Sequence, residues 1–200
     1  MQRFLDAALE LMNDSASGTD FTVQEVVEKS GQSLRSFYQY FGGKQELMLA
    51  LFEEAVLATT DNLRGLIAQE ETALDRLHTF VVEYYKICKP VRKRRATKLR
   101  ANPAMAQFGQ QLLTAQPVEA ARVFAPLVTL FEQVLDEAAA EKSVRANLAR
   151  HRVAGIILEA IMFNAFSRTI VGDADAEGGD PAEDLFDLVL HGIGTGTSKR

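Results

Sequence analysis

The sequence has little of the side-chain chemistry that metalloproteins and disulfide-linked proteins use. Cys88 is the single cysteine in 200 residues, so no internal disulfide can form, and this usage is typical of a reducing compartment. The three histidines, His78, His151 and His191, are scattered and share no metal-ligand spacing with Cys88. We therefore expect no metal site.

Catalytic and membrane motifs are also missing. The sequence has no Walker loop, dinucleotide fingerprint or nucleophile elbow. Glu159 interrupts a strongly apolar segment, but no acid–base partner accompanies it, which favours a satisfied core or interface carboxylate over a catalytic one. No apolar run reaches the roughly 18 residues of a membrane span, and no leader pattern opens the chain. We expect a soluble cytoplasmic protein that is not an enzyme, needs no cofactor and contacts no membrane.

Alternating β-patterns of useful length are absent, and helical periodicity extends along the chain, so we predict an all-α fold of about nine helices. The bounds expected for the clearest helices are 2–13, 44–69, 73–88, 103–113 and 145–171, with further helices starting at Pro117 and Pro181. Pro126 lies inside the apolar run 123–135 and should kink or restart that helix.

Residues 22–44, TVQEVVEKSGQSLRSFYQYFGGK, read as two short helices joined by a tight turn. Thr22 and Glu25 have the spacing of a capping box at the start of the first helix. Gly31 supplies the backbone freedom for a sharp reversal, and Ser33 caps the second helix. The pattern therefore predicts a helix–turn–helix.

The second of these helices should present two different faces. Leu34, Phe37, Tyr38 and Phe41 fall on one side, and the other side carries Arg35, Ser36, Gln39 and Tyr40. Arginine can bridge guanine O6 and N7, glutamine can bridge adenine N6 and N7, and hydroxyl groups reach phosphates or base edges. These side chains suit a DNA major groove, although a surface αα-hairpin with a solvated polar face would show the same pattern.

Between Phe21 and Leu47, the order Thr-Val, Gly-Gln-Ser, Phe-Tyr-Gln-Tyr-Phe and Lys-x-x-Leu resembles the N-terminal signature of the TetR family of bacterial one-component transcriptional regulators. Gln32 and Gly43 depart from the usual residue types of that signature. The resemblance implies a repressor that binds a palindromic operator in double-stranded DNA as a homodimer. It also implies the DNA-contacting residues, which are Thr22, Val23, Gln24, Ser33, Leu34, Arg35, Ser36, Tyr38, Gln39, Tyr40 and Lys44.

Two domains are expected: a DNA-binding head at residues 1–46 and a helical regulatory body at residues 47–200. The expected core of the head is Phe4, Leu5, Leu9, Phe21, Val26, Val27, Phe37 and Phe41. Residues 1–51 contain four Lys/Arg and seven Asp/Glu, and the whole chain has a formal charge of −5. Affinity for DNA must therefore come from a local face and not from bulk charge.

The body should bind a small, mainly apolar effector. In the resembled family a pocket lies among the body helices, and a kink at Pro126 would open space there. Candidate contacts are Phe80, Tyr84, Phe108, Phe131, Glu159, Phe163 and Asn164, although a filled aromatic core is the alternative. Residues 86–100 hold eight Lys/Arg and no acid, which fits a solvated segment, a DNA contact or a clamp for an acyl-coenzyme A effector.

The last two long helices carry more apolar residues than one core needs, which predicts a homodimer. The interface residues expected are Ile157, Ile161, Leu185, Phe186 and Val189.

Two rival functions remain open. One is an α-helical small-molecule carrier or enzyme with a structural head, which would show no salt-sensitive DNA binding. The other is an architectural DNA-binding protein without an effector, which a solid-cored body would favour.

Overall fold

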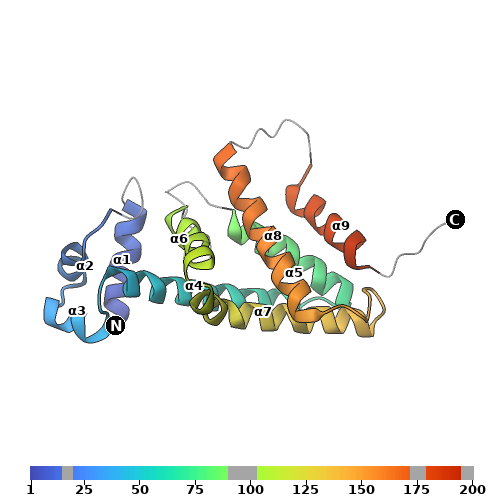
Figure 1. The fold of residues 1–200 in the computed structure, drawn as a ribbon, viewed down its shortest axis with the longest axis horizontal. Coiled ribbons are helices and arrows are strands. Elements are labelled where there is room, and N and C mark those ends of the chain that lie inside the picture. Colours follow the sequence, from blue (N-terminus) through green and yellow to red (C-terminus); the bar gives the residue numbers. More distant parts are fainter. Residues whose placement is uncertain (15–19, 90–102, 172–178, 195–200) are drawn as a thin grey trace. The chain divides into compact units, whose positions relative to one another are not determined.

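The computed structural model describes residues 1–14, 20–89, 103–171 and 179–194. Within these ranges the chain forms nine α-helices and no strand, which confirms the all-α prediction (Figure 1). The helices are α1 (Gln2–Asp14), α2 (Val23–Ser30), α3 (Leu34–Tyr40), α4 (Lys44–Ile67), α5 (Ala73–Cys88), α6 (Pro103–Ala115), α7 (Pro117–Ala140), α8 (Arg150–Val171) and α9 (Pro181–Ile193). None of them is long and apolar enough to cross a membrane.

The described residues form two compact units. The first draws on residues 1–57 and 90–124, and the second on residues 58–89 and 125–200, so α4 and α7 each contribute to both. The expected head lies wholly in the first unit, although this division differs from a boundary at residue 46. Helix α7 runs through Pro126 without the expected restart, even though proline cannot donate to the carbonyl four residues earlier.

Aromatic side chains fill the core of the head. Phe37 is fully buried, and its ring lies 5.4 Å from the rings of both Phe4 and Phe41. Val26 brings α2 onto the same core, and α1 and α2 pack side by side (Figure 1). Six of the eight expected core residues are buried, and Leu9 and Val27 are half-buried. This packing fixes the face that α3 turns outward.

Elsewhere in the first unit, Phe52 of α4 joins helices α6 and α7. Its ring lies 5.8 Å from Phe108 and 5.5 Å from Phe124. Gly109 allows this close approach, because a Cβ at that position would lie 2.7 Å from the Phe52 ring. Arg122 of α7 adds an ion pair with Glu53 of α4. The first half of α4 is therefore held firmly within this unit.

Helix α5 is central to the second unit and packs against both α8 and α9 (Figure 1). Its bounds agree with the expected 73–88, and Thr72 caps its start by accepting from the Asp75 amide at 3.1 Å. Phe80 of α5 stacks on Phe131 of α7 with ring centroids 4.5 Å apart, and both side chains are fully buried. The centre of this unit is therefore apolar and closely packed.

Helix α8 begins at Arg150 and not at the expected residue 145. The amide of Arg145 donates to the Ile193 carbonyl at 2.9 Å, which ties this segment to the end of α9. The guanidinium of Arg150 donates to the Ala146 carbonyl at 3.1 Å. Because these backbone groups are engaged outside a helix, residues 145–149 do not extend α8.

Candidate nucleic-acid interface

The helix–turn–helix begins with a capping box at Thr22. The Thr22 hydroxyl accepts from the Glu25 amide at 3.2 Å, and the Glu25 carboxylate accepts from the Thr22 amide at 2.6 Å. The carboxylate also accepts from the Thr22 hydroxyl at 2.8 Å. The two hydrogen bonds that the carboxylate accepts, from the backbone and then the side chain of Thr22, lower the pKa of Glu25, and the charge of Lys44 lowers it further. The start of α2 is thus fixed by local contacts, as the sequence predicts.

The turn between the helices uses Gly31 in the left-handed region, with φ of 63°. The Gly31 amide donates to the Glu28 carbonyl and the Gln32 amide to the Val27 carbonyl, which satisfies the last groups of α2. Ser33 then caps α3 by accepting from the Ser36 amide at 3.1 Å. The turn and both caps match the sequence expectation, and together they set the direction of α3.

The outer face of α3 carries most of the residues expected to contact DNA. Arg35, Gln39 and Tyr40 are exposed, and Ser36 is half-buried. The structure corrects the expected division of faces, because Leu34 and Tyr38 are 49% and 57% exposed and do not join the core. Five large side chains of this seven-residue helix therefore face solvent: Leu34, Arg35, Tyr38, Gln39 and Tyr40.

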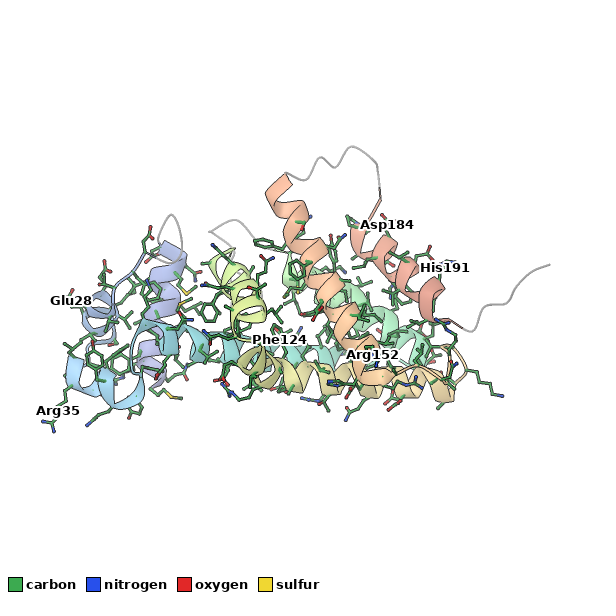
Figure 2. All side chains as sticks on the ribbon, viewed as in Figure 1. Glu28, Arg35, Phe124, Arg152, Asp184 and His191 are labelled. Atoms are coloured by element: carbon green, nitrogen blue, oxygen red, sulfur yellow. The ribbon has the colours of Figure 1, made fainter. Side chains whose placement is uncertain are left out.

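Arg35 is the cation best placed on this face. It forms no ion pair or hydrogen bond within the described part of the chain, and Figure 2 shows its side chain pointing away from the head. Lys29 is different, because Glu10 at 3.1 Å and Asp14 at 3.5 Å pair with it and hydrogen bonding to Glu10 raises its pKa. The positive charge available at α3 is therefore concentrated at Arg35.

Lys44, expected to contact DNA, contacts the protein itself. Its ammonium group donates to the Phe21 carbonyl at 2.5 Å and lies 4.4 Å from the centre of the Phe21 ring. Phe21 directly precedes the Thr22 cap, so this contact joins the start of α4 to the start of α2. Local sequence patterns do not predict the Phe21 contact, because the two residues lie 23 positions apart.

The expected effector residues are distributed over both units. Phe80, Tyr84 and Phe131 are buried in the second unit, whereas Phe108 belongs to the first unit and contacts Phe52. The remaining three lie on α8 and are exposed. They are Glu159, Phe163 and Asn164.

Two polar contacts accompany this aromatic cluster. Asn164 accepts a hydrogen bond of 3.2 Å from the Tyr85 hydroxyl. Desolvation raises the pKa of Tyr84, and the neighbouring Cys88 adds to the effect. Burial likewise raises the pKa of the Cys88 thiol from 9.0 to about 12, against a smaller lowering by the hydrogen bond with Tyr84. Both groups are thus held in their neutral forms.

The expected dimer residues mostly serve the chain's own core. Ile157, Ile161 and Leu185 are buried, and Phe186 packs edge-on against His78 with ring centroids 4.7 Å apart. Val189 is half-buried. Among the side chains of α8 and α9 whose burial is described, the large apolar ones left exposed are Ile156, Phe163 and Leu188, at 58%, 43% and 70%.

Sequence reasoning missed Ile156 and Leu188 as surface residues. A helix that is apolar on all sides has no periodic pattern that would distinguish a covered face from an exposed one. The basic residues at 90–100 and the acidic residues at 172–178 lie outside the described residues. Among the residues that are described, no three His, Cys, Asp or Glu side chains come together to hold a metal ion.

Comparison with known proteins agrees with this geometry. Residues 4–51 match the model of a family described as bacterial regulatory proteins, tetR family. The chain is 31% identical over 87 residues to YvdT of Bacillus subtilis (strain 168), described as an uncharacterized HTH-type transcriptional regulator. That match covers 40% of this chain and 44% of YvdT, so the similarity spans less than half of the relative.

Solved structures of similar fold cover nearly the whole chain. The fatty acid degradation regulator FadR from Bacillus halodurans superposes with a TM-score of 0.70 at 16% identity, covering 96% of this chain and 94% of that one. FadR from Bacillus subtilis, solved in complex with stearoyl-CoA, gives 0.69 at 15% identity, covering 96% and 98%. The reduced form of Escherichia coli NemR gives 0.69 at 15%, covering 98% and 97%. At these identities the likeness concerns the fold alone.

Proposed function

We propose that this chain, which carries the N-terminal domain of the TetR family of bacterial regulatory proteins, is a sequence-specific transcriptional repressor. In this proposal the protein binds a palindromic operator as a homodimer and leaves it when a small, mainly apolar effector binds. The observation that carries the proposal is the outer face of α3, where large side chains with base-reading chemistry face solvent on a helix held by two caps and a glycine turn.

Each side chain of that face has a chemical role in the proposal. Arg35 bridges O6 and N7 of a guanine, and Gln39 bridges N6 and N7 of an adenine in the major groove. The hydroxyls of Tyr38 and Tyr40 reach phosphates, as does the α2 start at Thr22, Val23 and Gln24. Ser33 caps α3 and Ser36 lies in its first turn, so both bring a hydroxyl group to the start of this helix. Phosphate contacts would fix the register of α3, and base contacts would supply the sequence preference.

The dimer is supported by the exposed apolar residues of the last two helices. Ile156 and Phe163 lie on one side of α8, since a spacing of seven residues is two helical turns. Leu188 adds an exposed leucine on α9. Arg152 of α8 and Asp184 of α9 are exposed charges of opposite sign on the same two helices (Figure 2). A two-fold interface would bury these apolar groups and pair such charges across subunits.

The effector part of the proposal rests on the buried aromatic cluster of the second unit. Phe80, Tyr84 and Phe131 provide apolar and aromatic surface, and Tyr84 with Cys88 provides the polar atoms that could orient a ligand. Because Phe80 and Phe131 stack on each other, an effector must part these rings or bind beside them. Such a ligand would favour one arrangement of the body and lower DNA affinity through its differential binding to the two arrangements.

Selection of DNA fragments by the purified full chain, followed by sequencing, tests the DNA-binding part. We expect an inverted repeat whose half-site centres are separated by about 34–36 Å or a multiple of that spacing. Recovery of no enriched sequence over random DNA would favour the carrier or enzyme alternative. A direct repeat or a single half-site would contradict the palindromic operator.

A screen of acyl-chain and acyl-coenzyme A compounds tests the effector part. A true effector at about a hundredfold its dissociation constant should stabilise the protein by about 2.7 kcal/mol. The same compound must also release the selected operator in a fluorescence anisotropy assay. Stabilisation without release would contradict the switch, and DNA binding unaffected by any bound compound would favour an architectural protein.

A further inference from the structure

Leu34 is an apolar side chain on a face whose other members are polar or aromatic. It is the first residue of α3 and is 49% exposed. The inner side of the helix is already occupied, because Phe37 and Phe41 are 0% and 4% exposed and contact each other and Phe4. A single exposed leucine is unremarkable on an ordinary surface. Here it lies beside Arg35, at the start of the part of α3 that is proposed to contact DNA.

The helix geometry relates Leu34 to the polar residues on the same face. Leu34 and Arg35 belong to the first turn of α3, and Tyr38 and Gln39 lie one turn further along. Four residues of helix rise about 6 Å, which is somewhat less than two base-pair steps of about 3.4 Å each. For a helix that lies along the major groove, Leu34 and Arg35 would therefore meet the same or adjacent base pairs, and Gln39 a base pair about two steps away.

Only one apolar group lies on the base edges of the major groove, and that is the C5 methyl of thymine. The other base edges present hydrogen-bond donors and acceptors, which a leucine would desolvate without replacing their partners. We propose that Leu34 reads a thymine methyl next to the guanine contacted by Arg35, which makes Leu34 a specificity-determining residue. This inference rests on the proposed DNA-binding function, and it adds a base preference to it.

Replacement of thymine by deoxyuridine tests the contact directly, because it removes the methyl group and leaves the pairing edge unchanged. The experiment uses the full chain and the operator obtained by selection, with each thymine of the half-sites replaced in turn. At one position the wild-type protein should bind about fourfold more weakly per half-site, the effect of losing one buried methyl group. The Leu34→Ala variant should bind the thymine operator more weakly than the wild type by a similar factor. Replacement of the thymine by deoxyuridine should then cause no further loss of affinity in this variant.

Leu57→Ala is the matched control, because Leu57 is a leucine of α4 with 51% exposure outside the head. It should keep the full sensitivity to deoxyuridine, as should Leu34→Met, which preserves an apolar side chain at the contact. Thermal melting of Leu34→Ala should match that of the wild type, since the side chain is outside the core.

Three results would overturn the inference. The first is a wild-type affinity unchanged by deoxyuridine at every thymine. The second is a loss of affinity on deoxyuridine that is equally large in Leu34→Ala, which would show that another residue contacts the thymine methyl. The third is an equal loss by Leu34→Ala on operator and random DNA, which would place Leu34 against the sugar–phosphate backbone. All three leave sequence-specific binding intact, whereas failure to select any DNA sequence would overturn the proposed function together with this inference.

Discussion

Lys44 donates to the Phe21 carbonyl and lies over the Phe21 ring, so part of its hydrogen-bonding capacity is used inside the head. We expect Lys44→Ala to lower the free energy of unfolding by about 1–2 kcal/mol, since a charge-assisted hydrogen bond and a cation–π contact are lost. The salt dependence of DNA binding should change little. Chemical denaturation and a salt titration of DNA affinity measure the two effects.

The opposite result would support the DNA contact expected for Lys44 from the sequence. If Lys44→Ala leaves stability unchanged and reduces the slope of log K against log salt by about 0.9, then Lys44 is a phosphate contact. Lys44→Met separates the contributions further, because it retains the aliphatic stem over Phe21 and loses the donor.

The Cys88 thiol shows how burial sets reactivity. Because desolvation raises its pKa to about 12, the thiolate fraction at neutral pH is lower by about a thousandfold than at the ordinary pKa of 9.0. We expect iodoacetamide to label the folded protein slowly and the urea-unfolded protein at the rate of a free cysteine peptide. Mass spectrometry over a time course measures both rates. Equal labelling of folded and unfolded protein would contradict the burial of this thiol.

At the scale of helices, the stability that the capping box contributes at the start of α2 should depend on pH. The pKa of Glu25 is lowered by hydrogen bonds from Thr22, so the ionised form is favoured in the folded state. Its contribution to stability is therefore complete above the unfolded pKa of about 4.5 and is lost as pH falls through the lower folded pKa. Glu25→Gln removes this titration while keeping a residue that suits the box.

The stability difference between wild type and Glu25→Gln should thus shrink as the pH is lowered below about 4.5. Thermal unfolding at several pH values measures it. A difference independent of pH between neutral and strongly acid solution would show that the carboxylate does not hold the Thr22 amide.

The helices also show which features can be predicted from sequence. The caps at Thr22 and Ser33 and the turn at Gly31 involve residues within five positions of each other, so local patterns predict them. The core residues Phe37 and Phe41 follow from helical spacing. Helical spacing places Leu34 and Tyr38 on the same face as these core residues, but both are exposed. In a helix of seven residues the periodicity alone does not locate the edge of the buried stripe.

Longer-range contacts account for the remaining differences. The start of α8 depends on a hydrogen bond between Arg145 and Ile193, 48 positions apart, so helical periodicity overestimated its length. Ile156 is exposed and Ile157 is buried, and this difference depends on how α8 packs against α5. An all-apolar segment contains no signal for that choice.

At the scale of the whole molecule, the exposed residues of α8 and α9 should control dimer formation. We expect Leu188→Asp and Phe163→Asp to weaken the dimer by at least about tenfold, since a charge would replace an apolar contact in a buried interface. Both side chains are exposed, so the fold of each subunit should survive. Val118→Asp is the control, because Val118 is 83% exposed on the first unit.

Sedimentation velocity measures the oligomeric state of each variant. A wild-type protein that is monomeric at micromolar concentration would contradict the dimer, and variants that remain dimeric would locate the interface elsewhere. Phe186 is less suitable for this purpose, because it packs on His78 and its replacement would also disturb the contact between α5 and α9.

The ratio of affinities for the selected operator and for a scrambled duplex, measured at one fixed salt concentration, tests the central claim that α3 reads DNA sequence. For Arg35→Ala we predict a loss of about 1–3 kcal/mol on the operator and a much smaller loss on the scrambled duplex, so that the ratio falls. Arg64→Ala, which removes an exposed arginine outside the head, should leave the ratio unchanged. An equal loss on both duplexes for Arg35→Ala would contradict the claim.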